Sequence, residues 1–340
     1  MILVDQKVIE KLSKTNQLIC EKSLLRGWKV YMPYLGSSHM YLDTGDGKLV
    51  HIFSSSPPTV SYASASLVNN KFATQSVLKS NGIDQLNCIL VSNFGSQKNE
   101  VAKFIDSFKR VVVKPVDSGH GNGITINVDN IGTVEKAIEY AQGFTKSGQV
   151  IVQEQFFADN IHDIRLLCID RKFIAGIERT PASVCGDGVS TVKRLIEDEN
   201  SKEYRGEPYR SKLAKIDLGL VKDYLGDQIN IVPSKGEKVQ VIGVANYGKG
   251  GETIDITDDV PEWMIDIAEK ISNILELDVA GIDFLTSVKL SKSLAYTTKI
   301  STVVEVNKCP ALSIHDWPTK GIDRKTTDKY LDLIEKMLKN

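Results

Sequence analysis

Three residues near the carboxyl end of the sequence have the side chains that magnesium prefers. Asp283 lies in Ala-Gly-Ile-Asp-Phe-Leu, while Glu305 and Asn307 lie in Val-Val-Glu-Val-Asn. Residues two apart on a strand point to the same face, so Glu305 and Asn307 share a face that Asp283 on an adjacent strand can oppose. Two carboxylates and an amide are hard oxygen ligands, and a divalent cation that bridges phosphates offsets the cost of burying them. The alternative is a face open to solvent, on which both acids are ordinary surface residues.

A lysine and a glycine-rich turn earlier in the chain are suited to bind phosphate. Residues 111–113 are three valines, which favour a strand covered on both faces, and Lys114 follows them. Gly119, Gly121 and Gly123 can adopt positive φ, so successive N–H groups can turn toward an anion beside the lysine. The turn has neither the Walker A order nor the dinucleotide fingerprint, and a glycine-rich hairpin is the alternative. Together with the later carboxylates, it predicts a site for a polyphosphate and Mg²⁺.

The composition is that of a globular protein without a strong charge bias. The chain has 340 residues, of which 41% are hydrophobic and 25% charged, and its formal charge is −1. This length allows two or three subdomains with their own cores. The balanced charge gives no reason to expect nucleic acid or an anionic membrane as a partner. Small-molecule chemistry is therefore the expected activity.

The sequence also predicts a cytoplasmic protein. The first residues carry charges too early for a secretory signal, and no stretch approaches eighteen uncharged apolar residues. The five cysteines are odd in number and form no Cys-x-x-Cys pair, so neither a disulfide framework nor a zinc cluster is indicated.

Periodicity and turn residues predict an alternation of helices and strands. Residues 1–62 favour a small α/β lobe, with a helix over about 5–26 and strands over 28–34, 40–42 and 48–53. Further elements are expected as a helix over 63–80, a strand over 89–92, a helix over 100–108, a strand over 124–128, a helix over 133–148, a strand over 150–155, and paired strands over 165–170 and 172–178. The stretch 179–233 looks charged and irregular apart from a helix over 191–199. Later elements are a strand over 239–244, a helix beginning at Pro261, strands over 279–285 and 302–306, and a C-terminal helix.

Taken together, the motifs resemble the ATP-grasp superfamily of carboxylate–amine ligases, from about Ala65 to the C-terminus. Within that superfamily the resemblance is to the ligase module of cyanophycin synthetase and of the fused bifunctional glutathione synthetases. The matching motifs are Val-Lys-Pro followed by His-Gly-Asn-Gly-Ile, Ala-Gly-Ile-Asp followed by Val-Glu-Val-Asn, and the helix that contains Lys71. Stretches typical of the cyanophycin-type branch are 179–188, 191, 195–196, 200, 205–206, 245–258 and 315–321.

The resemblance implies an α+β protein of the ATP-grasp fold, in which two α+β lobes clasp ATP beside a small N-terminal α/β lobe. Residues 1–62 would form the N-terminal lobe, which is like a preATP-grasp domain, and residues 63–340 the ATP-grasp domain. Within the latter, about 110–178 would clamp the nucleotide and 179–340 would carry substrate and metal.

The resemblance also implies roles for individual residues. Phosphates would be held by two lysines and the glycine turn, adenine by the segment after the strand at 150–155, and ribose by an aspartate. These ATP-binding residues are Lys71, Lys114, Ser118, Gly119, His120, Gly121, Gly123, Glu154, Gln155, Phe156, Phe157 and Asp163. Asp283, Glu305 and Asn307 would hold Mg²⁺, with Mn²⁺ as an alternative ion. Arg179 would face the transferred phosphoryl or acyl group and, with Lys114, form the catalytic pair. Lys71 on its own also reads as a solvated helix lysine.

The implied reaction joins a small carboxylate, such as an amino acid or short peptide, to an amine. A carboxylate is a poor acylating agent, and phosphorylation by ATP turns it into an acyl phosphate that an amine can attack, with release of ADP and phosphate. Cations offset the charge of the phosphoryl group, and a closed loop excludes water. The partners are then small-molecule carboxylate and amine substrates, without nucleic acid or membrane, and the resemblance leaves a homodimer open.

Two departures from the family pattern motivate alternatives. The chain has Ile242 where relatives have an arginine, and Ser313 where they have the arginine of Pro-Gly-x-Arg. One alternative is a protein that binds MgATP without catalysis, and another is a ligase with a thiol or hydroxyl acceptor. His120 and His315 suggest acid–base roles, but a lone loop histidine is also often structural, so neither is included among the catalytic residues. The sequence does not identify the substrates or the pathway.

Overall fold

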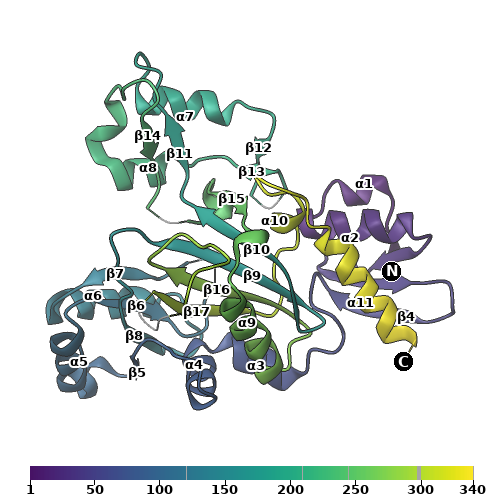
Figure 1. Ribbon diagram of the computed structural model, residues 1–340, viewed down its shortest axis with the longest axis horizontal. Coiled ribbons are helices and arrows are strands. Elements are labelled where there is room, and N and C mark those ends of the chain that lie inside the picture. The colour runs from purple at the N-terminus through teal and green to yellow at the C-terminus, as the bar shows by residue number, and fades with distance from the viewer. Residues whose placement is uncertain (120, 209, 244, 297–299, 340) are drawn as a thin grey trace.

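A computed structural model of the chain describes residues 1–119, 121–208, 210–243, 245–296 and 300–339. Figure 1 shows three main sheets: one near both termini, one at the lower left, and a central five-stranded sheet between them, with a smaller subdomain above. The cysteines of the chain are free thiols. Among the described residues, no helix combines the length and apolar character needed to cross a bilayer.

The N-terminal lobe is an antiparallel sheet in chain order. Its strands are β1 (Ile2–Leu3), β2 (Lys29–Met32), β3 (His39–Asp43) and β4 (Leu49–Phe53). Buried and exposed residues alternate along β4, so that Val50 and Ile52 point into the core. The helix expected over 5–26 is divided into α1 (Gln6–Ile9) and α2 (Lys14–Leu25).

The C-terminal helix completes this lobe. α11 (Thr326–Lys339) lies beside α2 in Figure 1, and Lys22 on α2 forms an ion pair with Asp328 on α11. Tyr330 and Ile334 are buried in the same core as the N-terminal sheet. The lobe expected from residues 1–62 therefore also contains the last helix of the chain.

Two helices replace the single helix expected over 63–80. α3 (Tyr62–Asn69) and α4 (Lys71–Ser80) are separated by Asn70, whose backbone is extended at φ −102° and ψ 100°. The Asn70 side chain accepts a hydrogen bond from the N–H of Ala73 and so caps α4. The break places Lys71 at the first position of α4, where its backbone N–H donates to the carbonyl of Val116 at 3.0 Å.

The lower-left lobe contains the lysine strand. Its antiparallel strands, in the order β5-β8-β6-β7, are β5 (Cys88–Val91), β8 (Val150–Glu154), β6 (Val111–Pro115) and β7 (Thr125–Val128). α5 (Phe94–Phe108) and α6 (Ile131–Gln142) pack on one face, where Val111 and Val113 are buried. Because side chains alternate along a strand, Lys114 points away from these helices.

The central sheet carries the late strands. Its order is β15-β10-β9-β16-β17, with β15 (Glu252–Asp255), β10 (Lys172–Thr180), β9 (His162–Ile169), β16 (Val279–Thr286) and β17 (Ser301–Asn307). β9 and β10 thus lie in this sheet, although most of their residues fall in the stretch 110–178 expected to clamp the nucleotide. α9 (Glu262–Ile274) covers one face and buries Leu166 and Phe284. The other face is polar at the end nearest the lower-left lobe.

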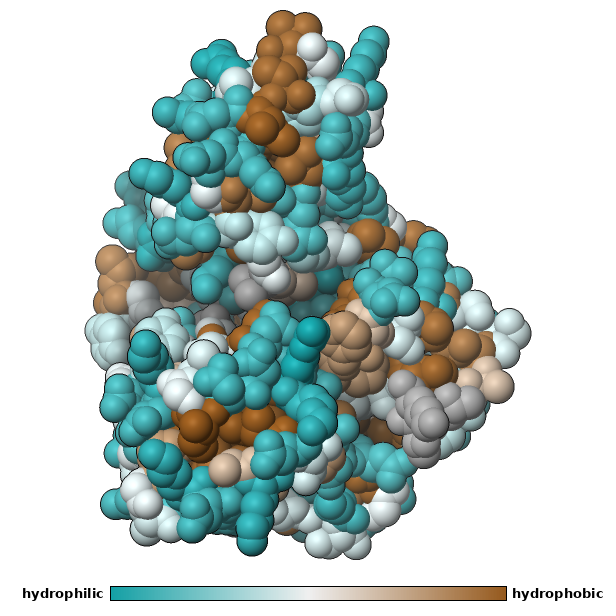
Figure 2. All heavy atoms as spheres, turned by 90° about the vertical axis from the view of Figure 1, so that its left-hand side faces the viewer, coloured by the Kyte–Doolittle hydropathy of each residue, from teal (hydrophilic) through white to brown (hydrophobic). Residues whose placement is uncertain are grey.

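The upper subdomain has a core of its own, although the sequence indicated an irregular segment. Its elements are β11 (Ser183–Cys185), α7 (Val192–Asn200), β12 (Arg205–Gly206), β13 (Leu213–Ala214), α8 (Leu218–Leu225), η1 (Gly226–Asn230), β14 (Lys238–Gln240) and η2 (Tyr247–Lys249). Val192, Ile196 and Val221 are buried together in this core. Figure 2 shows this subdomain above the lower lobe, with a hollow between them on a mainly hydrophilic face. The remaining elements are the short helices η3 (Thr257–Asp259) and α10 (Ser313–Asp316).

Candidate active site

One row of paired residues crosses the central sheet. It consists of Asp255 on β15, Ile177 on β10, Arg165 on β9, Asp283 on β16 and Glu305 on β17. Side chains of directly paired residues lie on the same face of a sheet, so four charged groups share the face opposite α9. We call this face, with the neighbouring pair Asp163 and Arg179, the charged face.

Asp283 is the buried anion that organises the charged face. Arg165 donates from Nε to Oδ1 and from Nη2 to Oδ2, both at 2.6 Å. Arg179 donates from Nη2 to Oδ2 at 3.0 Å. Burial opposes ionisation, but the two guanidinium groups hold the pKa of Asp283 below its ordinary value. Asp283 is therefore an ionised carboxylate that joins two arginines.

Asp163 is the second carboxylate of this network and titrates differently. Arg179 donates from Nε to its Oδ1 at 3.0 Å. Burial raises the pKa of Asp163 to about 6; the charge of Asp283 adds to this rise and that of Arg179 opposes it. As the pH falls, Asp163 is thus the first of the two carboxylates to take up a proton.

Arg165 is not among the site residues predicted from the sequence. It precedes the apolar run Leu-Leu-Cys-Ile in the buried part of β9 and lies two residues after Asp163. A charged side chain in a buried strand requires a partner, which is the signal that could have identified it. Only the pairing of β9 with β16 shows that the partner is Asp283.

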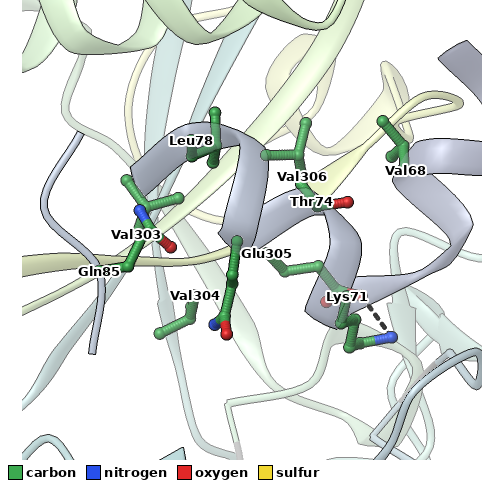
Figure 3. Close-up of a pocket in the computed structure, with 10 residues that line it drawn as sticks. Val68, Lys71, Thr74, Leu78, Gln85, Val303, Val304, Glu305 and Val306 are labelled. Carbon is green, nitrogen blue, oxygen red and sulfur yellow. Dashed lines mark ion pairs between the residues drawn. The ribbon is translucent and has the colours of Figure 1, made fainter. Parts of the chain in front are cut away.

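Lys71 and Lys114 reach the charged face from two other elements. Lys71 Nζ lies 3.2 Å from Glu305 Oε1 (Figure 3). It also donates to the carbonyl of Ser118. Burial lowers the pKa of Lys114 to about 8, against the attraction of Glu305 and with added repulsion from Lys71. The structure therefore brings both lysines into electrostatic contact with a carboxylate encoded far later in the sequence.

The glycine turn leaves space next to these lysines. Gly121 and Gly123 adopt φ values of 75° and 72°, whereas Gly119 does not adopt a positive φ. A Cβ at Gly123 would lie 2.8 Å from Pro115 Cγ, while at Gly119 and Gly121 it would meet nothing within 4 Å. His120, predicted to bind the nucleotide, lies outside the described residues. Gly123 thus permits close packing, and the space beside Gly119 and Gly121 is open.

Comparison with known proteins shows which fold this chain has. The family model described as "Prokaryotic glutathione synthetase, ATP-grasp domain" matches residues 84–188. The cyanophycin synthetase of Trichormus variabilis is 32% identical over 272 residues, which cover 79% of this chain and 29% of that protein. A crystal structure of a bifunctional glutathione synthetase from Pasteurella multocida has a TM-score of 0.71 at 25% identity, covering 96% of this chain and 45% of that one. The chain has an ATP-grasp fold. It is also 27% identical over 333 residues to the glutathione biosynthesis bifunctional protein GshAB of Clostridium perfringens, covering 96% of this chain and 41% of that protein.

This ATP-grasp chain therefore spans less than half the length of these relatives.

The three predicted metal ligands of the ATP-grasp chain lie on adjacent strands. Asp283 pairs with Glu305, and Asn307 pairs with Gly281. No three His, Cys, Asp or Glu side chains among the described residues are grouped to hold a metal, so a site here depends on the amide of Asn307. Asn307 Nδ2 is buried without a hydrogen-bond partner among the described residues. The oxygen donors suit Mg²⁺, but the Asp283 carboxylate already accepts bonds from two arginines and must share or release them.

The predicted adenine segment lies at the end of β8. Glu154 Oε2 accepts from the Asn87 side chain at 2.9 Å, and Gln155 Nε2 donates to Asn127 Oδ1 at 2.9 Å. Phe157 is 66% exposed, and the Arg110 guanidinium lies 5.0 Å from its ring centre. Phe156 follows Gln155 and is partly buried. Asp163 lies on β9 of the central sheet, whereas this segment follows β8 of the lower-left lobe. The Asp163 carboxylate already accepts a hydrogen bond from Arg179, so its predicted ribose contact would compete with that bond.

The two departures from the ATP-grasp pattern are structural in this chain. Ile242 is buried in the core of the upper subdomain. Ser313 is buried as well, and its Oγ lies 3.1 Å from Thr15 Oγ1 on α2. Neither side chain extends onto the charged face. The arginines that do, Arg165 and Arg179, come from β9 and β10.

Proposed function

We propose that this chain is an ATP-dependent ligase that joins a small carboxylate to an amine through an acyl phosphate, with release of ADP and phosphate. The observation that supports this most strongly is the convergence of Lys71 and Lys114 on Glu305, next to the two arginines on Asp283. Two lysines suit a triphosphate, and two arginines suit the carboxylate and the phosphoryl group it receives.

The lysines would bind the phosphates, and the glycine turn would cover them. Lys114 is buried, and the loss of hydration lowers its pKa. A bound phosphate would stabilise the charged ammonium group in place of water. Lys71 would exchange its contact with Glu305 for a phosphate oxygen. The open tip at Gly119 and Gly121 lets backbone N–H groups approach the same oxygens.

Glu305, Asn307 and Asp283 would hold Mg²⁺, or Mn²⁺ in its place. When bound, the ion offsets the negative charge of the phosphates during transfer. The exchange of Lys71 for a phosphate would also free Glu305 for this role.

The chain's arginines would hold the acyl substrate. The Nη1 groups of Arg165 and Arg179 make no hydrogen bond among the described residues. A substrate carboxylate bound there attacks the γ-phosphorus of ATP, and ADP leaves. The amine then attacks the acyl carbon, phosphate leaves with the electron pair of the broken C–O bond, and the amine proton passes to solvent. The arginines offset charge in both steps.

Release of ADP tests the proposal. We expect at least one pair from a broad panel of amino acids and short peptides to release ADP with MgATP at a rate above that of Glu305→Ala. If no pair exceeds that variant, the catalytic proposal fails. Saturable MgATP binding without ADP would instead support the non-catalytic alternative, and the product mass distinguishes an amide from an ester or thioester. The particular substrates, a homodimer and a cytoplasmic location remain predictions.

A further inference from the structure

Asp283 has two roles that compete, if the proposed function is correct. In this structure its Oδ1 accepts from Arg165 Nε, and its Oδ2 accepts from Arg165 Nη2 and Arg179 Nη2. As a metal ligand it would place a divalent cation next to the same guanidinium groups. Like charges around one carboxylate repel, so metal binding weakens the hold of Asp283 on its arginines.

The two arginines differ in what they retain when Asp283 turns to a metal. Arg179 keeps Asp163, to which it donates from Nε at 3.0 Å. Arg165 makes its side-chain hydrogen bonds among the described residues to Asp283 alone. Arg165 therefore needs a second acceptor if it is to stay on the charged face.

His315 on α10 is a buried side chain with such an acceptor. It is 1% exposed, and neither ring nitrogen has a hydrogen-bond partner among the described residues. α10 packs on β10, the neighbour of β9, so His315 lies near the charged face. Burial, together with the charges of Arg165 and Arg179, lowers its pKa to about 3. Its imidazole is neutral at physiological pH, so one nitrogen always has a free lone pair.

The residues on both sides of His315 are held by hydrogen bonds. Asp316 accepts hydrogen bonds from the backbone N–H and hydroxyl groups of Thr326 and Thr327. On the other side, Ser313 contacts Thr15 of α2. A buried imidazole without partners destabilises a fold, and its presence beside a charged cluster points to a partner that arrives in another state.

We propose that His315 is a positioning residue that accepts an N–H of Arg165 when Asp283 binds the metal of the nucleotide complex. Arg165 would then stay over the site with its charge uncompensated and available to the acyl group. A neutral acceptor suits this role because it orients the guanidinium without neutralising it, as a carboxylate would.

NMR of the protein labelled with ¹⁵N-histidine tests the proposal without turnover. The His315 signals are assigned by their loss in His315→Asn. On addition of MgADP we expect the signal of the unprotonated His315 nitrogen to shift upfield, as for a nitrogen that accepts a hydrogen bond. His39 and His51, whose ring nitrogens lie 3.0 Å apart on the N-terminal sheet, serve as an internal control that should not move.

Calorimetry on the same sample separates the two possible failures. If MgADP binds but the His315 signal does not move, the role of His315 is refuted while the proposed function stands. If MgADP does not bind, both are refuted.

Kinetics of two variants give a second test once a turning-over substrate pair is known. His315→Leu removes the acceptor, and we expect ADP formation at saturating substrate to fall about tenfold, with the KM for ATP unchanged. His315→Asn keeps a neutral acceptor and should remain within about threefold of wild type. Equal losses in the two variants would mean that His315 only fills space; if the leucine variant does not fold, the NMR result decides.

Discussion

The charged face and the upper subdomain both bury arginine, but they use it differently. Arg205 of the upper subdomain has a fully buried side chain. It donates from Nε to Glu199 at 2.8 Å and from Nη1 to the carbonyls of Ala214 and Gly250 at 2.8 and 3.2 Å. Among the described residues, the side chains of Arg165 and Arg179 bond to carboxylates alone, and these carboxylates have further roles in the proposed reaction. An arginine bound to backbone carbonyls of its subdomain stabilises the fold. One bound only to carboxylates that can exchange partners is able to bind a substrate.

Two asparagines show the same contrast. Asn200 donates to the carbonyl of Ile216 and accepts from its N–H, both at 2.8 Å, so its amide is satisfied. Asn307 on the charged face leaves its Nδ2 buried and unpaired within the described part of the chain. The same residue type is therefore fully bonded within the fold at one position and left with an unpaired group at the candidate site at another.

The largest effect is expected from Asp283→Asn. The substitution removes the charge that joins the two arginines and one ligand of the proposed metal site, so ADP formation should fall by about 10³-fold. Initial rates of ADP release measure this. Asp278→Asn is the matched control, because Asp278 pairs with Arg171 at 2.7 Å away from the charged face, and its rate should change less than about twofold. A rate for Asp283→Asn within tenfold of wild type would contradict the role of the charged face.

The second-largest effect is expected on stability, from a substitution of Arg205 in the upper subdomain. Arg205→Met should lower the free energy of unfolding by about 3 kcal/mol, because two carbonyls and Glu199 lose a buried donor. Affinity for ATP should stay the same, since the lysines belong to other lobes. Denaturant unfolding and calorimetry measure the two quantities. Arg194→Met, an exposed position on α7, should change stability by less than about 0.5 kcal/mol. A large loss of ATP affinity in Arg205→Met would contradict the conclusion that Arg205 only stabilises the fold.

A smaller effect with two signs is expected from Lys114→Met. ATP affinity should fall about 30-fold through loss of a charge-assisted contact, while the ligand-free protein should become more stable because a desolvated charge is removed. Calorimetric titration and denaturant unfolding measure the two changes. If ATP affinity and the stability of the ligand-free protein both decrease, Lys114 stabilises the fold, and its loss does not act through the nucleotide alone.

The pH dependence of the wild type tests the same residue. With the pKa of Lys114 lowered to about 8, ATP affinity should decrease as the pH rises through 8, and the methionine variant should lack this decrease. Between pH 8 and the ordinary lysine value the unfolded chain binds more protons than the folded one, so the contribution of Lys114 to stability rises with pH in that window. The two pH trends therefore have opposite directions.

The smallest effect concerns the helix that presents Lys71. Asn70→Ala removes the N-cap of α4 and should lower the free energy of unfolding by about 1 kcal/mol. ATP affinity should fall only slightly, because the lysine itself is retained. Asn70→Asp keeps a capping oxygen and should restore most of the stability. Equal stability of the alanine and aspartate variants would show that the break between α3 and α4 does not depend on this cap.

The sequence predicted the relative positions of the proposed metal ligands better than the contacts that hold them. The two-residue period of a strand was sufficient to put Glu305 and Asn307 on one face with Asp283 opposite, because strand alternation is a local property. The break at Asn70 was missed, since the apolar spacing runs through it and the capping residue is hidden within a helical pattern. The short helix α8 was missed for lack of length.

Long-range pairing accounts for the rest. Arg165 becomes a candidate site residue only because β9 lies between β10 and β16, and His315 only because α10 packs on β10. The position of β9 and β10 in the central sheet follows from strand order, which no local pattern encodes. Residues far apart in the chain have no periodicity that links them.

The place of α11 constrains how the protein is made. The side chains of Tyr330, Leu331 and Ile334 fill the core under the first sheet, so that core cannot close while they are still inside the ribosome. Until α11 has been synthesised, the nascent N-terminal strands present an uncovered apolar face, a surface that chaperones recognise. Removal of the last turns of α11 should therefore reduce the yield of folded protein, although it removes no residue of the charged face.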